Sequence, residues 1–281
     1  MGNKLLVIGA SGELGSQILR KSAGTELFST YYSRNNVIGG NGSFRLDVRD
    51  MKQVESLFYQ LKPDTVINTS VSDRSIGNKN EKDARQSIVD GALNIAIAGK
   101  KTGARTIHFS TDLVFDGTLG NYRENSPVNP FSIYGKCKAQ MEEGLLALDC
   151  DLAVVRTSLI ITFYPMGHQV SWIVNALRRN EELKLYTDEL RSPILGEDLA
   201  RAIIDLLQTN FRGLINIAGP EPMSRYQLGC LIADYYRLDK KLLKPVLSGD
   251  SNTERPLNCT LDSLWAYTLL GLKCRKISEI S

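Results

Sequence analysis

Short apolar runs alternate with longer segments of helical spacing through the first half of the chain. Residues 4–10, 63–71 and 105–111 are short runs rich in apolar or β-branched side chains and predict buried strands. Residues 51–62 and 81–101 repeat apolar positions every three or four residues, as amphipathic helices do. This alternation predicts a parallel sheet with helices on both faces, whose ligands bind at the carboxyl ends of the strands.

The alternation loosens after about residue 160. Segments 170–186, 196–209 and 223–239 predict helices, and Ser224 and Gln227 have the spacing of a capping box at the start of the third. The chain contains no internal repeat and no low-complexity linker.

We therefore expect an α/β protein with one large and one smaller part. Residues 1–160 are expected to form a Rossmann-type doubly wound parallel sheet. Residues 161–281 are expected to form mainly a substrate-binding region, with some elements packing back on that sheet.

Composition excludes several classes of partner. The chain has 281 residues, of which 42% are hydrophobic and 23% charged, as in an ordinary globular protein. A net charge of +3 is too small to predict a nucleic-acid surface. No apolar run approaches the length that crosses a bilayer, and the first apolar run leads into glycines rather than a signal cleavage site. We expect a cytoplasmic protein with no membrane partner.

Cysteine and histidine usage predicts neither disulfides nor a metal site. The five cysteines are scattered without a CxxC pair, and their odd number suits reduced thiols. The only histidines are His108 and His168, too few for a typical zinc site without paired cysteines.

The first predicted strand ends in the glycine loop "GASGELG". Gly9, Gly12 and Gly15 let the backbone approach a pyrophosphate, which the free N–H groups of the following helix can bind. Glycines also serve tight turns, but the order of strand, loop and helix favours a dinucleotide site. The residues expected to contact the cofactor here are Gly9, Ser11, Gly12, Glu13, Leu14 and Gly15.

The end of the second predicted strand indicates which dinucleotide is preferred. No acidic residue follows Glu26 in residues 26–35, so the ribose 2′-hydroxyl of NAD lacks its usual partner. Ser33 and Arg34 would instead receive the 2′-phosphate of NADP, although Arg34 also fits a plain surface arginine. We expect NADP to be preferred, with NAD as the alternative. After the third strand, the cofactor contacts are expected at Asp47 and Val48, with Asp47 either capping a turn or meeting the adenine edge.

The stretch "IYGKCKAQ" places Tyr134 and Lys138 four residues apart. On a helix the two side chains share a face. An ammonium beside a phenol favours the phenolate and lowers a pKa that is otherwise near 10, which makes the tyrosine a candidate acid or base. Such pairs also occur by chance on solvated helix faces, so the assignment depends on the rest of the chain.

Several motifs occur together in a characteristic order. "FSTDLVFDG", with "GASGELG", "YGKCK", "RTSLI", "DLARAI", "NIAGPEPMSRYQL" and "RPLNCTLD", resembles the dTDP-4-dehydrorhamnose reductase family of extended short-chain dehydrogenase/reductases. The resemblance covers nearly the whole chain. It implies a protein that binds NADP or NAD and reduces the C4 ketone of a nucleotide-linked sugar.

Carried over residue by residue, the resemblance assigns three catalytic residues. Tyr134 would donate a proton to the carbonyl oxygen, Lys138 would hold the nicotinamide ribose, and Thr111 would hydrogen-bond the same oxygen. Asn68, Thr69 and Ser70 would line the middle of the cofactor. The residues expected to face the substrate are Ser110, Asp112, Thr157, Leu159 and Arg255, with Arg255 either pairing with a diphosphate or forming a structural salt bridge.

The chain departs from the family pattern at three places. Ile88 stands where the family usually has an asparagine that supports the lysine, and Leu159 stands where it usually has a tryptophan. Residues 73–83 lack the acidic character common in relatives, and they receive no assignment.

Two rival interpretations of the same motifs are weighed against the reductase. A dehydratase or epimerase of the same superfamily would use the same tyrosine and lysine, but Leu113 replaces the glutamate that a dehydratase typically needs. A regulatory subunit resembling that of methionine adenosyltransferase would bind NADP without catalysis. The expected partner is a nucleotide-sugar substrate. The sequence leaves open whether the chain forms a homodimer.

Overall fold

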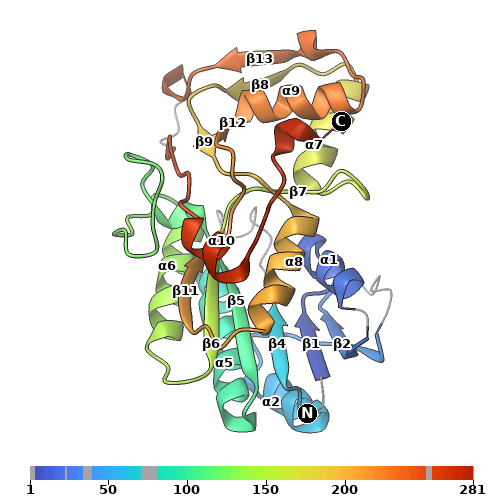
Figure 1. Cartoon of the computed structure of the whole chain (residues 1–281), viewed down its shortest axis with the longest axis vertical. Coiled ribbons are helices and arrows are strands. Elements are labelled where there is room, and N and C mark those ends of the chain that lie inside the picture. The colour runs from blue at the N-terminus through green and yellow to red at the C-terminus, as the bar shows by residue number, and fades with distance from the viewer. Residues whose placement is uncertain (1–3, 23, 34–39, 71–80, 251–254, 281) are drawn as a thin grey trace.

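The computed structural model describes residues 4–22, 24–33, 40–70, 81–250 and 255–280. Within these residues a seven-stranded parallel sheet forms the centre of the molecule (Figure 1). From edge to edge its strands are β11 (Gly213–Asn216), β6 (Leu152–Thr157), β5 (Arg105–Thr111), β4 (Thr65–Asn68), β1 (Lys4–Ile8), β2 (Glu26–Tyr31) and β3 (Gly42–Arg45). The order from β3 to β6 is that of a Rossmann fold, so the predicted fold class is confirmed.

One face of the sheet is covered by α1 (Glu13–Lys21) and α8 (Gly196–Leu207). Ile18 and Ile203, which are fully buried, belong to the same apolar cluster as Val155 of β6. Each helix therefore buries its apolar stripe against alternate residues of the strands.

The opposite face is covered by α2 (Met51–Leu61), α5 (Gly91–Thr102) and α6 (Ile133–Leu146). Phe58 and Ile95 are fully buried there. α2 and α5 thus agree with the two helices predicted from the apolar spacing of residues 51–62 and 81–101.

A π-helical turn interrupts the long helix that precedes β5. It spans Gln86–Asp90 and joins α4 (Glu81–Arg85) to α5. Ile88 lies in this turn, is 3% exposed, and belongs to the apolar cluster that includes Tyr134. The departure from the family pattern at this position therefore contributes an apolar side chain to the core behind the candidate tyrosine.

One predicted helix was too long. Residues 170–186 form α7 (His168–Arg178) followed by strand β8 (Leu183–Tyr186), which pairs in parallel with β13 (Leu243–Val246). The helix stops because Asn180 adopts a left-handed conformation with φ +55°. The partner strand lies about sixty residues further along the chain, so local spacing carried no sign of it.

The second region packs as a small layer above the carboxyl edge of the main sheet (Figure 1). α9 (Arg225–Tyr235) opens with the predicted capping box, in which both the Ser224 and Gln227 contacts are present. Two further short strand pairs complete the region: β7 (Ile160–Ile161) with β10 (Ile194–Leu195), and β9 (Leu190–Arg191) with β12 (Met223–Ser224).

The C-terminal segment returns from the sheet to this region. After α10 (Leu264–Leu270) the chain runs upward in Figure 1, and Ile277 is buried in the cluster formed by α7 and α9. No helix in the described part of the chain is long and apolar enough to span a membrane.

Candidate active site

The glycine loop has the shape that a pyrophosphate needs. Gly9 has φ +78°, and a Cβ there would lie 2.7 Å from the backbone nitrogen of Ser70. A Cβ on Gly15 would lie 2.7 Å from Cα of Ala10. Gly12 precedes α1 without a side-chain cap, which leaves the first N–H groups of the helix available to an anion. These residues fit an NAD(P) dinucleotide.

The other side chains of the loop lie either in the core or at the wall of a cavity. Leu14 is buried in the core beneath α1. Ser11 and Glu13 border a cavity of about 520 Å³, whose far wall is the segment before α7. The Glu13 carboxylate reaches that wall, where Oε2 accepts a hydrogen bond from the backbone nitrogen of His168 at 3.0 Å.

A cationic cluster stands at the ends of β2 and β3. Arg49 Nη2 donates to the Tyr32 hydroxyl at 2.8 Å, and the Arg45 guanidinium lies 5.8 Å from the centroid of the same ring. Ser33 is exposed beside Tyr32, whereas Arg34 lies outside the described residues. Sequence reasoning missed both residues because it looked for the 2′-phosphate contacts after the second strand, whereas Arg45 ends β3 and Arg49 follows it.

Asp47 uses its carboxylate within this cluster. Arg49 donates to it from Nε at 2.8 Å and from Nη2 at 2.6 Å, and the side-chain hydrogen bonds of Arg49 lower the pKa of Asp47. The backbone nitrogen of Arg49 also donates to the Asp47 carboxylate at 3.0 Å. Asp47 therefore caps a turn, which was one of its two expected roles. The carbonyl of Val48 accepts from Asn94 at 3.0 Å and so anchors the loop to α5.

The end of β4 is tied to the glycine loop. Thr69 Oγ1 donates to the carbonyls of Ile8 at 2.8 Å and Gly9 at 3.1 Å. The Asn68 side-chain oxygen accepts from both the nitrogen and the hydroxyl of Ser70, and its nitrogen lies 3.4 Å from Nδ1 of His108. These bonds fix the loop that would face the middle of the dinucleotide.

Tyr134 and Lys138 lie on one face of α6. Ser132 caps the helix by accepting from the nitrogen of Gly135 at 3.0 Å. The Lys138 ammonium lies 6.0 Å from the centroid of the Tyr134 ring and donates to the carbonyl of Phe109 at 2.6 Å. Tyr134 is 7% exposed and Lys138 is 4% exposed, so the pair is held against the end of β5.

Polar side chains surround Asp112 at the end of β5. The Thr111 hydroxyl donates to Asp112 Oδ1 at 3.1 Å and accepts from the nitrogen of Leu113. The Ser158 hydroxyl donates to Asp112 Oδ2 at 2.6 Å. Ser110 is buried one residue earlier, and its hydroxyl has no hydrogen-bond partner among the described residues. Asp112 is therefore the acceptor that organises this end of the strand.

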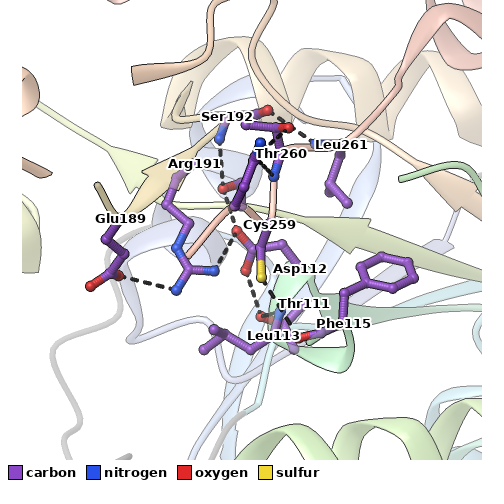
Figure 2. Close-up of polar contacts among 12 residues, drawn as sticks. Thr111, Asp112, Leu113, Phe115, Glu189, Arg191, Ser192, Cys259, Thr260 and Leu261 are labelled. Atoms are coloured by element: carbon purple, nitrogen blue, oxygen red, sulfur yellow. Dashed lines mark hydrogen bonds and ion pairs between the residues drawn. The ribbon is translucent and has the colours of Figure 1, made fainter. Parts of the chain in front are cut away.

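A buried arginine pairs with that carboxylate from the second region. Arg191 is 5% exposed, its Nη1 lies 3.6 Å from Asp112, and its Nη2 donates to Glu189 at 3.1 Å (Figure 2). Burial by itself lowers the pKa of Arg191, but the two carboxylates raise it on balance, so the guanidinium is charged at every working pH. Cys259 lies beside it, and burial raises the pKa of its thiol to about 12.

A cavity of about 570 Å³ lies between the end of β5, the start of α6 and Arg191. Its size is typical of small-molecule sites. Four of the predicted site residues besides Arg255 line it: Thr111, Asp112, Tyr134 and Leu159. Thr157 does not line this cavity, and its buried hydroxyl has no hydrogen-bond partner among the described residues.

The lining residues that sequence reasoning did not select include Gln169, Arg191 and Arg225. Arg225 lies inside the recognised "MSRYQL" stretch, which could have singled it out. Arg191 lies in a two-residue strand, two positions before a proline, and belongs to none of the recognised motifs.

Arg255 stands at the rim of the cavity. Its Nη1 lies 3.7 Å from Glu189, and its guanidinium lies 4.9 Å from the centroid of Tyr186. Arg255 therefore forms the structural salt bridge that was the alternative to a diphosphate contact. Its side chain is still 44% exposed.

The sequence matches one protein family over almost its full length. The family model described as "RmlD substrate binding domain" matches residues 3–279. Spore coat polysaccharide biosynthesis protein SpsK of Bacillus subtilis (strain 168) is 29% identical, covering 90% of this chain and 87% of its own. The dTDP-4-dehydrorhamnose reductase of Aggregatibacter actinomycetemcomitans is 27% identical, covering 96% and 94%. Methionine adenosyltransferase 2 subunit beta of Bos taurus is 26% identical, covering 95% and 82%.

Solved structures resemble the whole chain. A hypothetical dTDP-4-dehydrorhamnose reductase from Sulfolobus tokodaii superposes with a TM-score of 0.83 at 30% identity, covering 95% of this chain and 94% of its own. The dTDP-4-dehydrorhamnose reductase of Bacillus anthracis, solved with NADP, has a TM-score of 0.86 at 23% identity and covers 99% and 97%. At that lower identity the second likeness shows the fold alone.

Proposed function

The chain belongs to the RmlD substrate binding domain family, and we propose on that premise that it is an NAD(P)H-dependent reductase of a nucleotide-linked 4-keto sugar. The single observation that carries the proposal is the cavity in which Tyr134 and Thr111 meet three arginines from the second region. It combines a proton donor with cationic groups suited to a diphosphate.

The dinucleotide site is proposed to hold NADPH in preference to NADH. Bound there, the cofactor supplies a hydride to the carbonyl carbon of the substrate. The glycine loop would hold the pyrophosphate, and Ser33, Arg45 and Arg49 would face the 2′-phosphate, because a cationic cluster favours the additional negative charge.

Tyr134 is proposed to protonate the oxygen on which negative charge develops during reduction. Its ring forms part of the cavity wall, and the neighbouring Lys138 ammonium stabilises negative charge on the phenol. Thr111 lies beside it, and its hydroxyl would turn from Asp112 toward the substrate oxygen.

The arginines are proposed to bind the nucleotide diphosphate. Arg225 and Arg255 border the cavity, and guanidinium groups recognise phosphate oxygens in a bidentate manner. Arg191 is buried deeper; its Nη1 faces Asp112 at 3.6 Å, and its Nε has no hydrogen-bond partner among the described residues. Buried N–H groups of this kind favour a ligand with acceptor oxygens.

Two titrations test this function. The purified protein would be titrated with NADPH and NADH, and then with a panel of dTDP-linked and UDP-linked 4-keto sugars while the reduced-nicotinamide absorbance is followed. Oxidation of NADPH by one of these sugars is expected. Tight NADPH binding with no oxidation by any of them would contradict a reductase.

A regulatory subunit is the second candidate, favoured by one specific observation. Ile88 is an apolar group in the cluster behind Tyr134, where the family pattern has a polar support for the lysine. That replacement would suit a fold retained for NADP binding, and a stable partner would then copurify with the chain. An epimerase is the remaining enzyme alternative, and it would convert its nucleotide sugar without net oxidation of NADPH.

We further propose that the protein works in the cytoplasm and that it forms a homodimer. All five cysteines are free thiols, in keeping with a reducing compartment. Leu264 and Trp265 of α10 are 68% and 49% exposed and give a second copy an apolar contact. Light scattering on the purified protein would test the dimer.

A further inference from the structure

The carboxylate of Glu13 joins the glycine loop to the start of α7. Glu13 is the first residue of α1, yet its Oε2 accepts from the nitrogen of His168, 155 residues later in the chain. A Cβ on Gly167 would meet the end of this flexible side chain, so the glycine leaves the carboxylate room beside the start of α7. Oε1 is buried and has no hydrogen-bond partner among the described residues. The carboxylate thus lies between the N-termini of two helices.

The first turn of α7 carries this contact onward to the catalytic cavity. Gln169 directly follows His168, and its side-chain oxygen accepts from Nη2 of Arg225 at 2.9 Å. Both Gln169 and Arg225 line the cavity, and Arg225 is the first residue of α9. A continuous set of contacts therefore connects the loop for the dinucleotide with an arginine proposed to bind the diphosphate.

A bound pyrophosphate would change the balance of forces on Glu13. At the N-terminus of α1 it would repel the carboxylate, whose other favourable position is the positive end of α7. The phosphate would thus strengthen the contact between Glu13 and His168 and hold Gln169 in place. A ligand shifts a conformational equilibrium only through such a difference in interaction energy between two states.

We propose that Glu13 is a positioning residue that couples occupancy of the dinucleotide site to the affinity of the cavity for a nucleoside diphosphate. The inference rests on the proposed function, from which it takes both ligands. Because coupling between two bound ligands is reciprocal, the diphosphate must tighten dinucleotide binding by the same factor.

Calorimetric titration of dTDP with and without saturating NADP⁺ tests the coupling, since the two ligands do not react. For the wild-type protein we expect dTDP to bind about tenfold more tightly when NADP⁺ is present, within the usual range for coupled sites. Glu13→Gln keeps the size of the side chain and an acceptor oxygen but removes the charge. We expect it to bring the ratio of the two affinities to within about twofold of one.

Two further variants separate coupling from general damage. Gln169→Leu breaks the hydrogen bond to Arg225 without altering the glycine loop. Like Glu13→Gln, it should bring the ratio of the dTDP affinities with and without NADP⁺ close to one. Glu143→Gln removes an exposed carboxylate of α6 and should keep the wild-type ratio. A purely structural role of Glu13 would weaken both affinities and leave their ratio unchanged.

Each outcome has a definite meaning. A tenfold ratio that is lost in Glu13→Gln and Gln169→Leu supports the inference. A wild-type ratio near one, or variants that keep the wild-type ratio, overturns it while leaving the proposed function intact. Failure of dTDP to bind with or without NADP⁺ contradicts the proposed function, and the inference falls with it.

Discussion

The Lys138 ammonium lies 6.0 Å from the centroid of the Tyr134 ring while it donates to the carbonyl of Phe109 at 2.6 Å. This arrangement anchors the charge of the lysine to the end of β5 and places it beside the phenol. A fixed positive charge next to a proton donor helps that group to transfer its proton.

Replacing Tyr134 with phenylalanine should reduce kcat by about 10²–10⁴-fold, the usual contribution of a general acid. The Kd for NADPH should stay nearly unchanged, because the change removes a proton and little packing. Steady-state kinetics with a 4-keto nucleotide sugar and fluorescence titration of NADPH would measure both quantities. Tyr59→Phe, at an exposed position of α2, is the matched control, and an undiminished kcat in Tyr134→Phe would remove this residue from the mechanism.

Arg49→Ala should weaken NADPH binding about tenfold more than NADH binding, because only NADPH presents a 2′-phosphate to the guanidinium. Parallel titrations with both cofactors would measure the two Kd values. Arg179→Ala removes an exposed arginine that pairs with Glu181 and should alter neither. Equal losses for both cofactors would reassign Arg49 to holding Asp47 in place, and Arg34→Ala would then be the next variant to titrate.

The fully buried His108 should make folding stability depend on pH. Burial, and secondarily the charge of Lys138, lowers its pKa to about 3. The unfolded chain therefore takes up this proton near pH 6.5, so the contribution of His108 is fully present above that pH and is lost as pH falls toward 3. The expected slope from this group is about 1.4 kcal/mol per pH unit in that window.

Urea unfolding of the wild-type protein and of His108→Gln across that pH window would measure the slope. The difference between the two proteins isolates this residue from other titrating groups. His168→Gln, at the exposed position of the only other histidine, serves as the control. The assignment would be wrong if the wild-type protein and His108→Gln lost stability in parallel.

The buried ion pair between Arg156 and Glu142 should anchor α6, which carries the candidate tyrosine, to strand β6. The guanidinium donates to the carboxylate from Nε at 2.9 Å and from Nη2 at 2.6 Å, and both side chains are almost fully buried. Glu142→Ala should lower the free energy of unfolding by about 3–5 kcal/mol, because it leaves an uncompensated buried charge. Denaturant titration would measure the change, and a loss below about 1 kcal/mol would contradict the anchoring role.

Local features made much of the fold predictable. The glycine loop, the capping box at Ser224 and the apolar stripes of the flanking helices are all set by residues close together in sequence. Strand β8 was not predictable, since its partner β13 lies about sixty residues away and local spacing favoured a helix.

The cavity was predictable only in part, for the same reason. Thr111 and Tyr134 belong to motifs whose chemistry depends on near neighbours. The place of Arg191 in the cavity could be identified only from the structure, which brings it to 3.6 Å from Asp112. The two residues are 79 positions apart in the chain. A charged residue in a short strand carries no sequence signal that it will be buried beside a distant carboxylate.

Oxidation of bound NADPH by a nucleotide-linked 4-keto sugar is the measurement that tests the central claim most directly. In a single-turnover experiment with the isolated wild-type protein, we predict loss of the reduced-nicotinamide absorbance on addition of such a sugar, and formation of the corresponding 4-hydroxy sugar in equal amount. Tyr134→Phe, loaded with NADPH to the same extent, should react at least about 10²-fold more slowly. A protein that binds both NADPH and the sugar yet leaves the absorbance unchanged would contradict the assignment as a reductase.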